Sequence, residues 1–433
     1  MSKKTRTILF LACLFLFFLT APLIILYSQG YRFDLNPPVG GIKLTQTGGF
    51  GLKAEPKQVE IYIDGKLAKK TDFLFGSALV ENLLPKRYKI EVKKEGYLTW
   101  EKNLEIKEKE VVEIKNIILF PENIDFVILN KGVEGFWFSP DEKKTIFLET
   151  EEGREDWALK LYNLERNIKS HLISEADINQ SGANLLNLEF SEDSKEIYLG
   201  VETAEASPDS AKKDQEKTFT LKLDEVPPRL AEKEVIPSPE NILTSREYNQ
   251  DVYYLDNTGY VFKNDLRINE TPFPVKPEAE YALEIFSDFI FLVAEDQALY
   301  WFSQETKSFE IFFDKIKDLK ISPDKKKLAF FSSSEVWILF LRDEGVKKTG
   351  EKLFLVRLSE KIGDVFWLNS DYLVLNSGNN LKIVEIDDRD RIQTWDIAST
   401  QSFNAGGRIY FNGHNKKLYT LSDGNLFTSK KLF

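Results

Sequence analysis

One short motif, a turn followed by an apolar run, recurs along the chain from about residue 119 onward. It reads FSPD at 138–141 and ISPD at 321–324, and in both places charged residues and then a largely apolar run follow. Serine can hydrogen-bond the turn backbone, proline presets φ at the second turn position, and aspartate tolerates the next. The motif therefore predicts a hairpin turn with a charged tip that leads into a buried β-strand.

Weaker versions of the motif lie between these two copies and beyond them. The seven leading positions are 138, 190, 248, 286, 321, 366 and 403. Seven copies in roughly 313 residues correspond to about 45 residues per copy, the length of one four-stranded blade. The spacing predicts an all-β fold whose larger part, residues 121–433, is a β-propeller of about seven blades.

Residues 138–147 and 321–330 resemble the WD40-like propeller repeats of TolB-type proteins, whose consensus is FSPDGKKIAF. Glu142 and Lys325 stand where glycine is usual in those repeats. The resemblance implies a propeller that binds other molecules on its flat faces. The strand that completes the last blade beside residues 426–433 is left open between two segments, 117–120 and 124–129.

The N-terminus has the pattern of a membrane anchor. Lys3, Lys4 and Arg6 precede residues 8–27, which contain no charged residue. Twenty helical residues span about 30 Å, the thickness of the hydrocarbon core of a bilayer. Basic residues before the span favour a cytoplasmic N-terminus, with the rest of the chain outside. A cleaved signal peptide is the alternative, although its apolar core is usually only about 7–15 residues long.

A small β domain is expected between the anchor and the repeats, over residues 36–120. A turn-rich segment with Pro37, Pro38 and several glycines opens it. Residues 59–63 and 88–92 alternate apolar and polar side chains, which is typical of strands with one buried face. Asp64 and Gly65 form the dipeptide that favours a tight hairpin turn. Further strands are predicted at 98–106 and 111–119.

The stretch EIYIDGK at 60–66, Thr71, the Leu-Pro pair at 84–85 and the closing KEGY at 94–97 together resemble the PEGA domain. The resemblance covers roughly residues 40–120 and implies a small β-sandwich-like module near the cell surface, with no catalytic residues. Two departures affect the turns: residues 56–59 read PKQV in place of the naming tetrad, and Lys86 replaces the usual glycine.

Two polar segments interrupt the repeats. Residues 202–217 lack large apolar side chains and predict a long exposed hairpin loop within the second blade. Prolines at 227–228 and at 237 and 239 bracket a second expected linker, between blades two and three.

Composition and motifs exclude several classes of binding and catalytic site. The formal net charge is -11, so the chain lacks the basic balance that nucleic-acid binding requires. Cys13 is the only cysteine, which excludes an internal disulfide and leaves it the expected role of a buried apolar filler. His171 and His414 each stand alone, and His414 is predicted at a hairpin tip. The sequence has no nucleophile elbow, P-loop or dinucleotide-binding glycine motif.

The densest acidic cluster is DDRDR at 387–391. Carboxylate oxygens suit Ca²⁺, but the interleaved arginines oppose a cation site, so a solvated hairpin turn is the preferred interpretation.

The sequence is thus interpreted as a cytoplasmic tip and transmembrane anchor (1–35), a PEGA-like domain (36–120) and a WD40-like propeller (121–433). We expect a single-pass, extracytoplasmic binding or scaffold protein that docks an unidentified protein or a cell-envelope polymer. No catalytic, cofactor or metal residues are assigned, and enzymatic activity is not expected. The alternatives are a polysaccharide-acting enzyme that uses the propeller channel and a structural surface-layer component.

Overall fold

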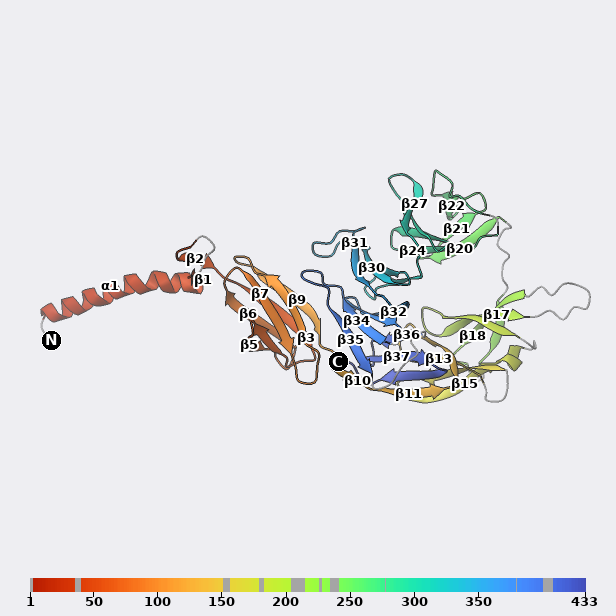
Figure 1. Ribbon diagram of the computed structural model, residues 1–433, viewed down its shortest axis with the longest axis horizontal. Coiled ribbons are helices and arrows are strands. Elements are labelled where there is room, and N and C mark those ends of the chain that lie inside the picture. The colour runs from red at the N-terminus through yellow and green to blue at the C-terminus, as the bar shows by residue number, and fades with distance from the viewer. Residues whose placement is uncertain are drawn as a thin grey trace, which may run out of the picture. The chain divides into compact units, whose positions relative to one another are not determined.

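The computed structural model describes residues 3–35, 40–150, 156–178, 183–203, 215–225, 228–233, 241–276, 278–378, 380–399 and 408–433. The chain forms two compact units. Unit 1 comprises Met1–Asn123, Asp387–Gln393 and Leu432–Phe433, and unit 2 comprises Ile124–Ile386 and Thr394–Lys431. Apart from one long helix and one turn of 3₁₀ helix (Glu175–Ile178), the regular structure described is β-strand, as the sequence predicted (Figure 1).

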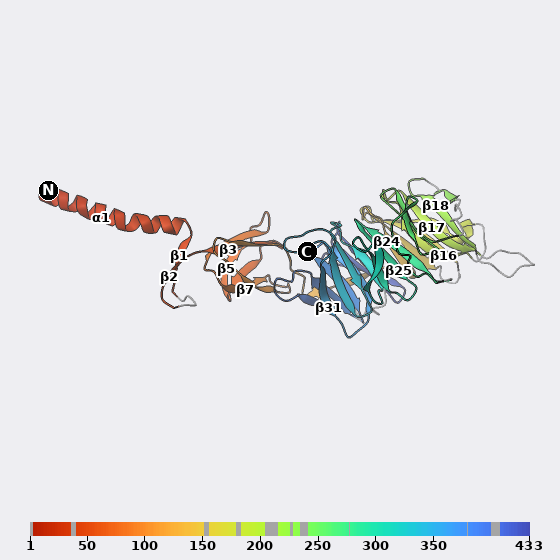
Figure 2. The same cartoon turned by 90° about the horizontal axis from the view of Figure 1, so that it is seen from above.

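The long helix is α1 (Lys3–Ser28), which contains the whole apolar run. It is long and apolar enough to cross a membrane, and none of its residues is buried in the protein. Both Figure 1 and Figure 2 draw it as one continuous helix that leads into the small β domain of unit 1. Cys13 is exposed on this helix, so the rest of the protein does not bury it, and its expected role as an apolar filler within a membrane span stays a prediction.

After α1, unit 1 forms a hairpin and two sheets. The hairpin pairs β1 (Tyr31–Asp34) with β2 (Lys43–Gln46). The three-stranded sheet has the order β6 (Ser77–Leu83), β3 (Gly48–Glu55), β9 (Val111–Ile118). The four-stranded sheet has the order β5 (Lys66–Lys70), β4 (Glu60–Ile63), β7 (Arg87–Lys93), β8 (Trp100–Glu105). The predicted strands at 59–63, 88–92, 98–106 and 111–119 are therefore confirmed as β4, β7, β8 and β9.

The two sheets of unit 1 share an apolar core. Ile61 and Ile90 of the four-stranded sheet and Phe50 of the three-stranded sheet are fully buried. The Phe50 and Tyr88 rings meet edge to face across the sheets, with centroids 6.2 Å apart. Asp64 and Gly65 have positive φ values of 48° and 76°, which turn β4 directly into β5. The period-two pattern thus selects the face that each strand buries.

Unit 2 is a succession of antiparallel sheets, each mostly of four consecutive strands. The first four sheets contain β12 (Val133–Phe138), β13 (Lys144–Thr150), β14 (Trp157–Asn163), β15 (Ile168–Ser174); β16 (Asn184–Phe190), β17 (Glu196–Thr203), β18 (Gln215–Lys222), β19 (Leu230–Lys233); β20 (Ile242–Tyr248), β21 (Asp251–Asp256), β22 (Val261–Lys263), β23 (Leu266–Arg267); and β24 (Tyr281–Phe286), β25 (Phe289–Ala294), β26 (Leu299–Ser303), β27 (Ser308–Phe313).

Three further sheets follow. They contain β28 (Asp318–Ile321), β29 (Lys327–Phe331), β30 (Glu335–Phe340), β31 (Lys352–Arg357); β32 (Ile362–Asn369), β33 (Tyr372–Ser377), β34 (Asn380–Glu385), β35 (Thr394–Ser399), with β10 (Asn123–Ile124) at the edge; and β36 (Ile409–Asn412), β37 (Lys417–Ser422), β38 (Asn425–Ser429), β11 (Phe126–Lys131). In the last sheet the first strand of the unit, β11, pairs antiparallel with its final strand, β38. Of the two segments left open by the sequence, 124–129 therefore supplies the missing strand.

The repeated motif forms the predicted turns. The Ser139 hydroxyl donates to the Asp141 carboxylate at 2.6 Å, and Ser322 and Asp324 repeat the bond at the same distance. Strands β13 and β29 follow these turns as expected. Glu142 and Lys325 adopt positive φ values of 58° and 59°. Their left-handed conformation explains why the resembling repeats usually have glycine there.

Several expectations fall partly or wholly outside the described residues. These are the turn-rich segment at 36–39, the linker prolines at 227, 237 and 239, and the last repeat start at 403–407. The loop expected at 202–217 is shorter than predicted, because β17 continues to Thr203 and pairs with Gln215 of β18. The remainder of that loop, 204–214, lies outside the described residues.

Candidate binding cavity

The first strands of the seven sheets of unit 2 line two adjoining open cavities, with volumes of about 730 and 850 Å³. The walls include residues of β12, β16, β20, β24, β28, β32 and β36. Five residues line both cavities: Glu189, Arg246, Asp318, Lys320 and Phe366. We call the combined space the first-strand cavity.

Charged side chains of both signs face this cavity. The Arg246 guanidinium on β20 lies 3.7 Å from the Glu284 carboxylate on β24, and the Lys320 ammonium lies 2.5 Å from the Asp318 carboxylate on β28. Arg408, directly before β36, holds its guanidinium 5.6 Å from the centre of the Trp137 ring. Opposite charges therefore lie side by side around the space.

Two carboxyl groups of the cavity have raised pKa values. Burial raises the pKa of Glu284, and the carboxylates of Asp318 and Glu189 add to the effect while Arg246 opposes it. Burial also raises the pKa of Asp364, although Lys320 and backbone N–H groups partly compensate. Such shifts concentrate at functional sites, because binding and catalysis both use charges held in poorly solvated pockets.

An aromatic group forms another part of the wall. The rings of Phe138 and Tyr410 are stacked, with centroids 3.9 Å apart and planes 3° from parallel. Phe366 lies 4.7 Å from Tyr410, and burial raises the pKa of the Tyr410 hydroxyl above its ordinary range. A concave site with aromatic surface and a few fixed charges can bind a polar molecule that has flat apolar faces.

Sequence reasoning missed these charged residues. Glu189, Arg246, Glu284, Asp318 and Asp364 stand one to three positions before the leading residues of their repeats. That repeated offset is the signal that could have found them. The motif itself predicts only a turn, yet Pro140 and Pro323 also line the cavity.

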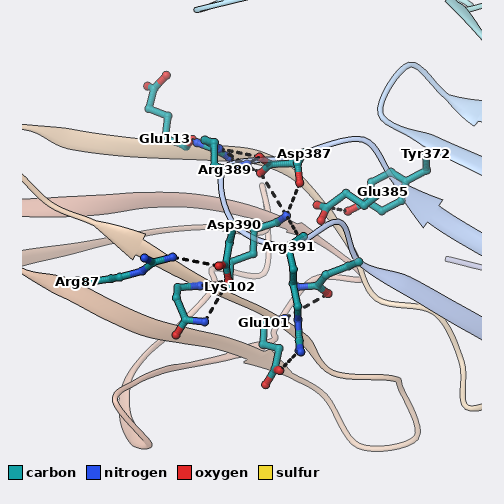
Figure 3. A network of polar contacts seen from close by, with 12 residues as sticks. Arg87, Glu101, Lys102, Glu113, Tyr372, Glu385, Asp387, Arg389, Asp390 and Arg391 are labelled. Atoms are coloured by element: carbon teal, nitrogen blue, oxygen red, sulfur yellow. Dashed lines mark hydrogen bonds and ion pairs between the residues drawn. The ribbon is translucent and has the colours of Figure 1, made fainter. Parts of the chain in front are cut away.

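The acidic cluster at 387–391 lies elsewhere, within unit 1 (Figure 3). It forms the connection between β34 and β35. The Asp390 carboxylate accepts hydrogen bonds from the Asn103 amide N–H at 2.8 Å, the Asn103 side chain at 3.0 Å and Arg87 at 3.0 Å. These contacts fix the connection on β7 and β8. The segment is thus a hairpin connection, as expected, but the expectation that it is solvated is wrong.

Lys102 anchors the same connection from β8 (Figure 3). Its side chain is fully buried, and its ammonium donates to the backbone carbonyls of Asp387 at 2.6 Å and Arg391 at 3.2 Å. Burial opposes ionisation of Asp387, but hydrogen bonds from Arg389 and the charge of Lys102 lower its pKa overall. The carboxylates are thus engaged by protein cations, which argues against the calcium alternative.

The two histidines lie at exposed positions and line neither cavity. His171 Nε2 is 3.9 Å from the Asp177 carboxylate, and His414 Nε2 is 3.7 Å from that of Glu165. His414 occupies the turn between β36 and β37, as predicted. Among the described residues, no group of three or more His, Cys, Asp or Glu side chains could hold a metal ion.

No protein-family model matches the sequence, and no curated protein matches it. Among solved structures, the crystal structure of a eukaryotic initiation factor is 14% identical with a TM-score of 0.42, over 68% of this chain and 82% of that one. The extracellular domain of a hybrid two-component system from B. thetaiotaomicron is 9% identical with a TM-score of 0.43, over 93% of this chain and 56% of that one. At such TM-scores neither likeness identifies the fold or the function of this chain.

Proposed function

We propose that this chain is a membrane-anchored, extracytoplasmic binding or scaffold protein whose unit 2 is a seven-bladed β-propeller. Three observations support the propeller: seven sheets of four or five strands, a cavity lined by the first strand of each, and closure of the last sheet by β11. The PEGA-like assignment of unit 1 rests on the sequence resemblance and on its two packed sheets. Basic residues at the start of α1, before its apolar run, support a cytoplasmic N-terminus.

The observation that carries the binding function is the first-strand cavity, with its paired charges and aromatic wall. A protein segment or an envelope polymer fits such a site, because both combine polar groups with apolar faces. A nucleic acid is not the proposed ligand, since the chain as a whole carries a net charge of -11.

The test is saturable binding of the purified full chain, in nanodiscs, to isolated cell-wall material and separately to solubilised membrane proteins. The double variant Arg246→Ala/Lys320→Ala removes two cations of the cavity and should weaken binding at least tenfold. Lys195→Ala, on an exposed turn outside the cavity, is the matched control and should bind like the unaltered chain. Equal binding by all three proteins would place the binding site elsewhere.

An enzyme acting on polysaccharide is a second candidate, favoured by one observation. Glu284 and Asp364 have raised pKa values and line the first-strand cavity, which Asp318 and Glu189 also line. Glycoside hydrolysis uses a pair of carboxyl groups, one of them with a raised pKa. Release of reducing ends from wall polysaccharide by the unaltered chain, but not by Glu284→Gln or Asp364→Asn, would favour the enzyme over the binding protein.

A further inference from the structure

The hairpin that follows α1 has an uncovered apolar face. Strands β1 and β2 form a two-stranded sheet in which Phe33 pairs with Leu44. These two side chains are 58% and 39% exposed. Leu35 follows β1 directly and Ile42 directly precedes β2, and their side chains are 74% and 71% exposed. The four exposed apolar side chains therefore gather at the turn end of the hairpin, next to its last pair, Asp34 and Lys43.

The opposite face of the hairpin is attached to the rest of unit 1. Thr45 is buried, and its pairing partner Arg32 donates to the Asn82 side chain of the small β domain at 2.6 Å. Arg32 also donates to the Tyr27 carbonyl at the end of α1, and its guanidinium lies 3.5 Å from the centre of the Tyr27 ring. Arg32 and Thr45 therefore attach this face to protein, while the four apolar side chains are exposed.

The hairpin is held at the end of α1. The backbone N–H and hydroxyl of Thr47, which follows β2, donate to the Gly30 carbonyl at 2.9 and 2.8 Å. Phe33 stands five residues after Ser28, the last residue of the helix. Five extended residues reach at most about 17 Å. Beyond the hydrocarbon core, the headgroup layer on each side of a bilayer is about 5–8 Å thick. The short connection thus confines the apolar face to the neighbourhood of that layer.

We propose that the apolar face of Phe33, Leu35, Ile42 and Leu44 lies in the lipid surface of the membrane that α1 crosses. The inference rests on the proposed membrane anchor. Continuity with α1, a reach of five residues and large exposed side chains identify lipid as the occupant. The hairpin then lies at the membrane interface and holds the small β domain close to the bilayer. Amphipathic segments bind membranes in the same way, by burying one apolar face at the boundary between headgroups and acyl chains.

The experiment uses site-directed spin labels on the full chain in nanodiscs, with Cys13→Ser as the background. Phe33→Cys and Leu44→Cys report on the apolar face, and Asp34→Cys and Lys43→Cys, also paired with each other, report on the opposite face. Leu16→Cys, exposed in the middle of α1, reports on the membrane span itself. Collision of each label is measured with oxygen, which is enriched in lipid, and with a water-soluble nickel chelate.

We expect labels 33 and 44 to collide severalfold more with oxygen than with nickel, and labels 34 and 43 to show the reverse. Oxygen-rich behaviour at position 16 with nickel-rich behaviour at 33 and 44 would overturn the hairpin proposal alone. Protection of 33 and 44 from both reagents would mean that protein, not lipid, covers the face, and would also overturn it. A water-exposed label at 16 would overturn the membrane anchor on which the proposal rests.

Discussion

At the scale of single residues, the turns of the repeats concentrate backbone strain. Glu142, Ser194 and Lys325 occupy equivalent places in their motifs and have φ values of 58°, 60° and 59°. A side chain in this left-handed region costs about 1–2 kcal/mol relative to the right-handed one. The surrounding turn tolerates the cost because the serine–aspartate hydrogen bonds and the flanking strands hold the backbone in place.

Lys325→Gly is therefore expected to stabilise unit 2. Glycine removes the strain but adds freedom to the unfolded chain, so the net gain in unfolding free energy should be about 0.5–1 kcal/mol. Chemical denaturation followed by tryptophan fluorescence measures it.

Ser194→Gly is the matched comparison for that substitution. It relieves the same conformation but deletes a hydroxyl that accepts a hydrogen bond from the Asp141 N–H at 3.1 Å. We expect this variant to gain less than Lys325→Gly or to lose stability. A larger gain for Ser194→Gly would show that the Ser194 hydroxyl does not stabilise the turn.

Asp364 should make the unfolding free energy of unit 2 depend on pH. Its pKa is raised in the folded state by burial, above the ordinary value of 3.8. An acid whose pKa is raised in the folded state binds its proton more tightly when the protein is folded. Its stabilising contribution to the unfolding free energy is therefore largest below pH 3.8 and is lost as the pH rises through the folded-state pKa. Asp364→Asn should remove this decline and raise stability at pH 7.

The measurement is the unfolding free energy of both proteins between pH 4 and pH 7. Asparagine keeps one oxygen that can accept from the Val365 or Ile409 N–H, so the local backbone contacts survive in part. Parallel pH curves for the two proteins would contradict the prediction. If the cavity binds its ligand through Asp364, the same variant will be more stable and bind less well.

At the scale of elements, the connection between β34 and β35 depends on one buried lysine. Lys102→Met keeps much of the volume but leaves the Asp387 and Arg391 carbonyls without their shared donor. We expect unit 1 to lose about 3 kcal/mol of unfolding free energy, the usual cost of breaking a buried polar network. Hydrogen exchange of residues 387–393 should also become faster.

Lys89→Met on the neighbouring strand β7 is the control. Its ammonium forms ion pairs with Glu101 at 2.9 Å and Glu91 at 3.4 Å, but the side chain is 46% exposed. Exposed ion pairs contribute less than about 1 kcal/mol, so a small change is expected. Equal losses for the two variants would mean that burial of Lys102 does not carry the effect.

At the scale of the whole molecule, the pairing of β11 with β38 closes unit 2 on itself. Lys131 pairs with Asn425, so a disulfide between cysteines at these positions would join residues about 300 apart in sequence. Closing a loop of that length should stabilise by about 6 kcal/mol in the chain-entropy model. The variant Lys131→Cys/Asn425→Cys is made with Cys13→Ser, and its unfolding midpoint is compared with and without reductant.

Glu247→Cys/Val252→Cys, across the β20–β21 hairpin, is the matched control because it links paired residues only five apart. The same model gives about 2 kcal/mol for that short loop. A reductant-sensitive shift clearly larger for the long link supports closure by β11. Failure of the long link to form, while the short one forms, would show that these strands do not pair in solution.

The sequence alone determined the features that depend on near neighbours. The apolar helix α1, the period-two strands such as β4 and β7, and the turns at 138–141 and 321–324 follow from residues only a few positions apart. Alternation selects the buried face of a strand, and proline, serine and aspartate select the turn, whatever the rest of the chain does. These features were therefore predicted correctly.

The tertiary structure decided the features that depend on distant residues. Pairing of β11 with β38, contact of Lys102 with the connection at 387–393, and the meeting of Arg246 with Glu284 all join segments that local pattern treats as separate. The local sequence around a charged residue before a turn does not distinguish a side chain that points to solvent from one that points into a cavity. Only packing of the sheets removes water from one such position and leaves it around another, and that difference creates the candidate site.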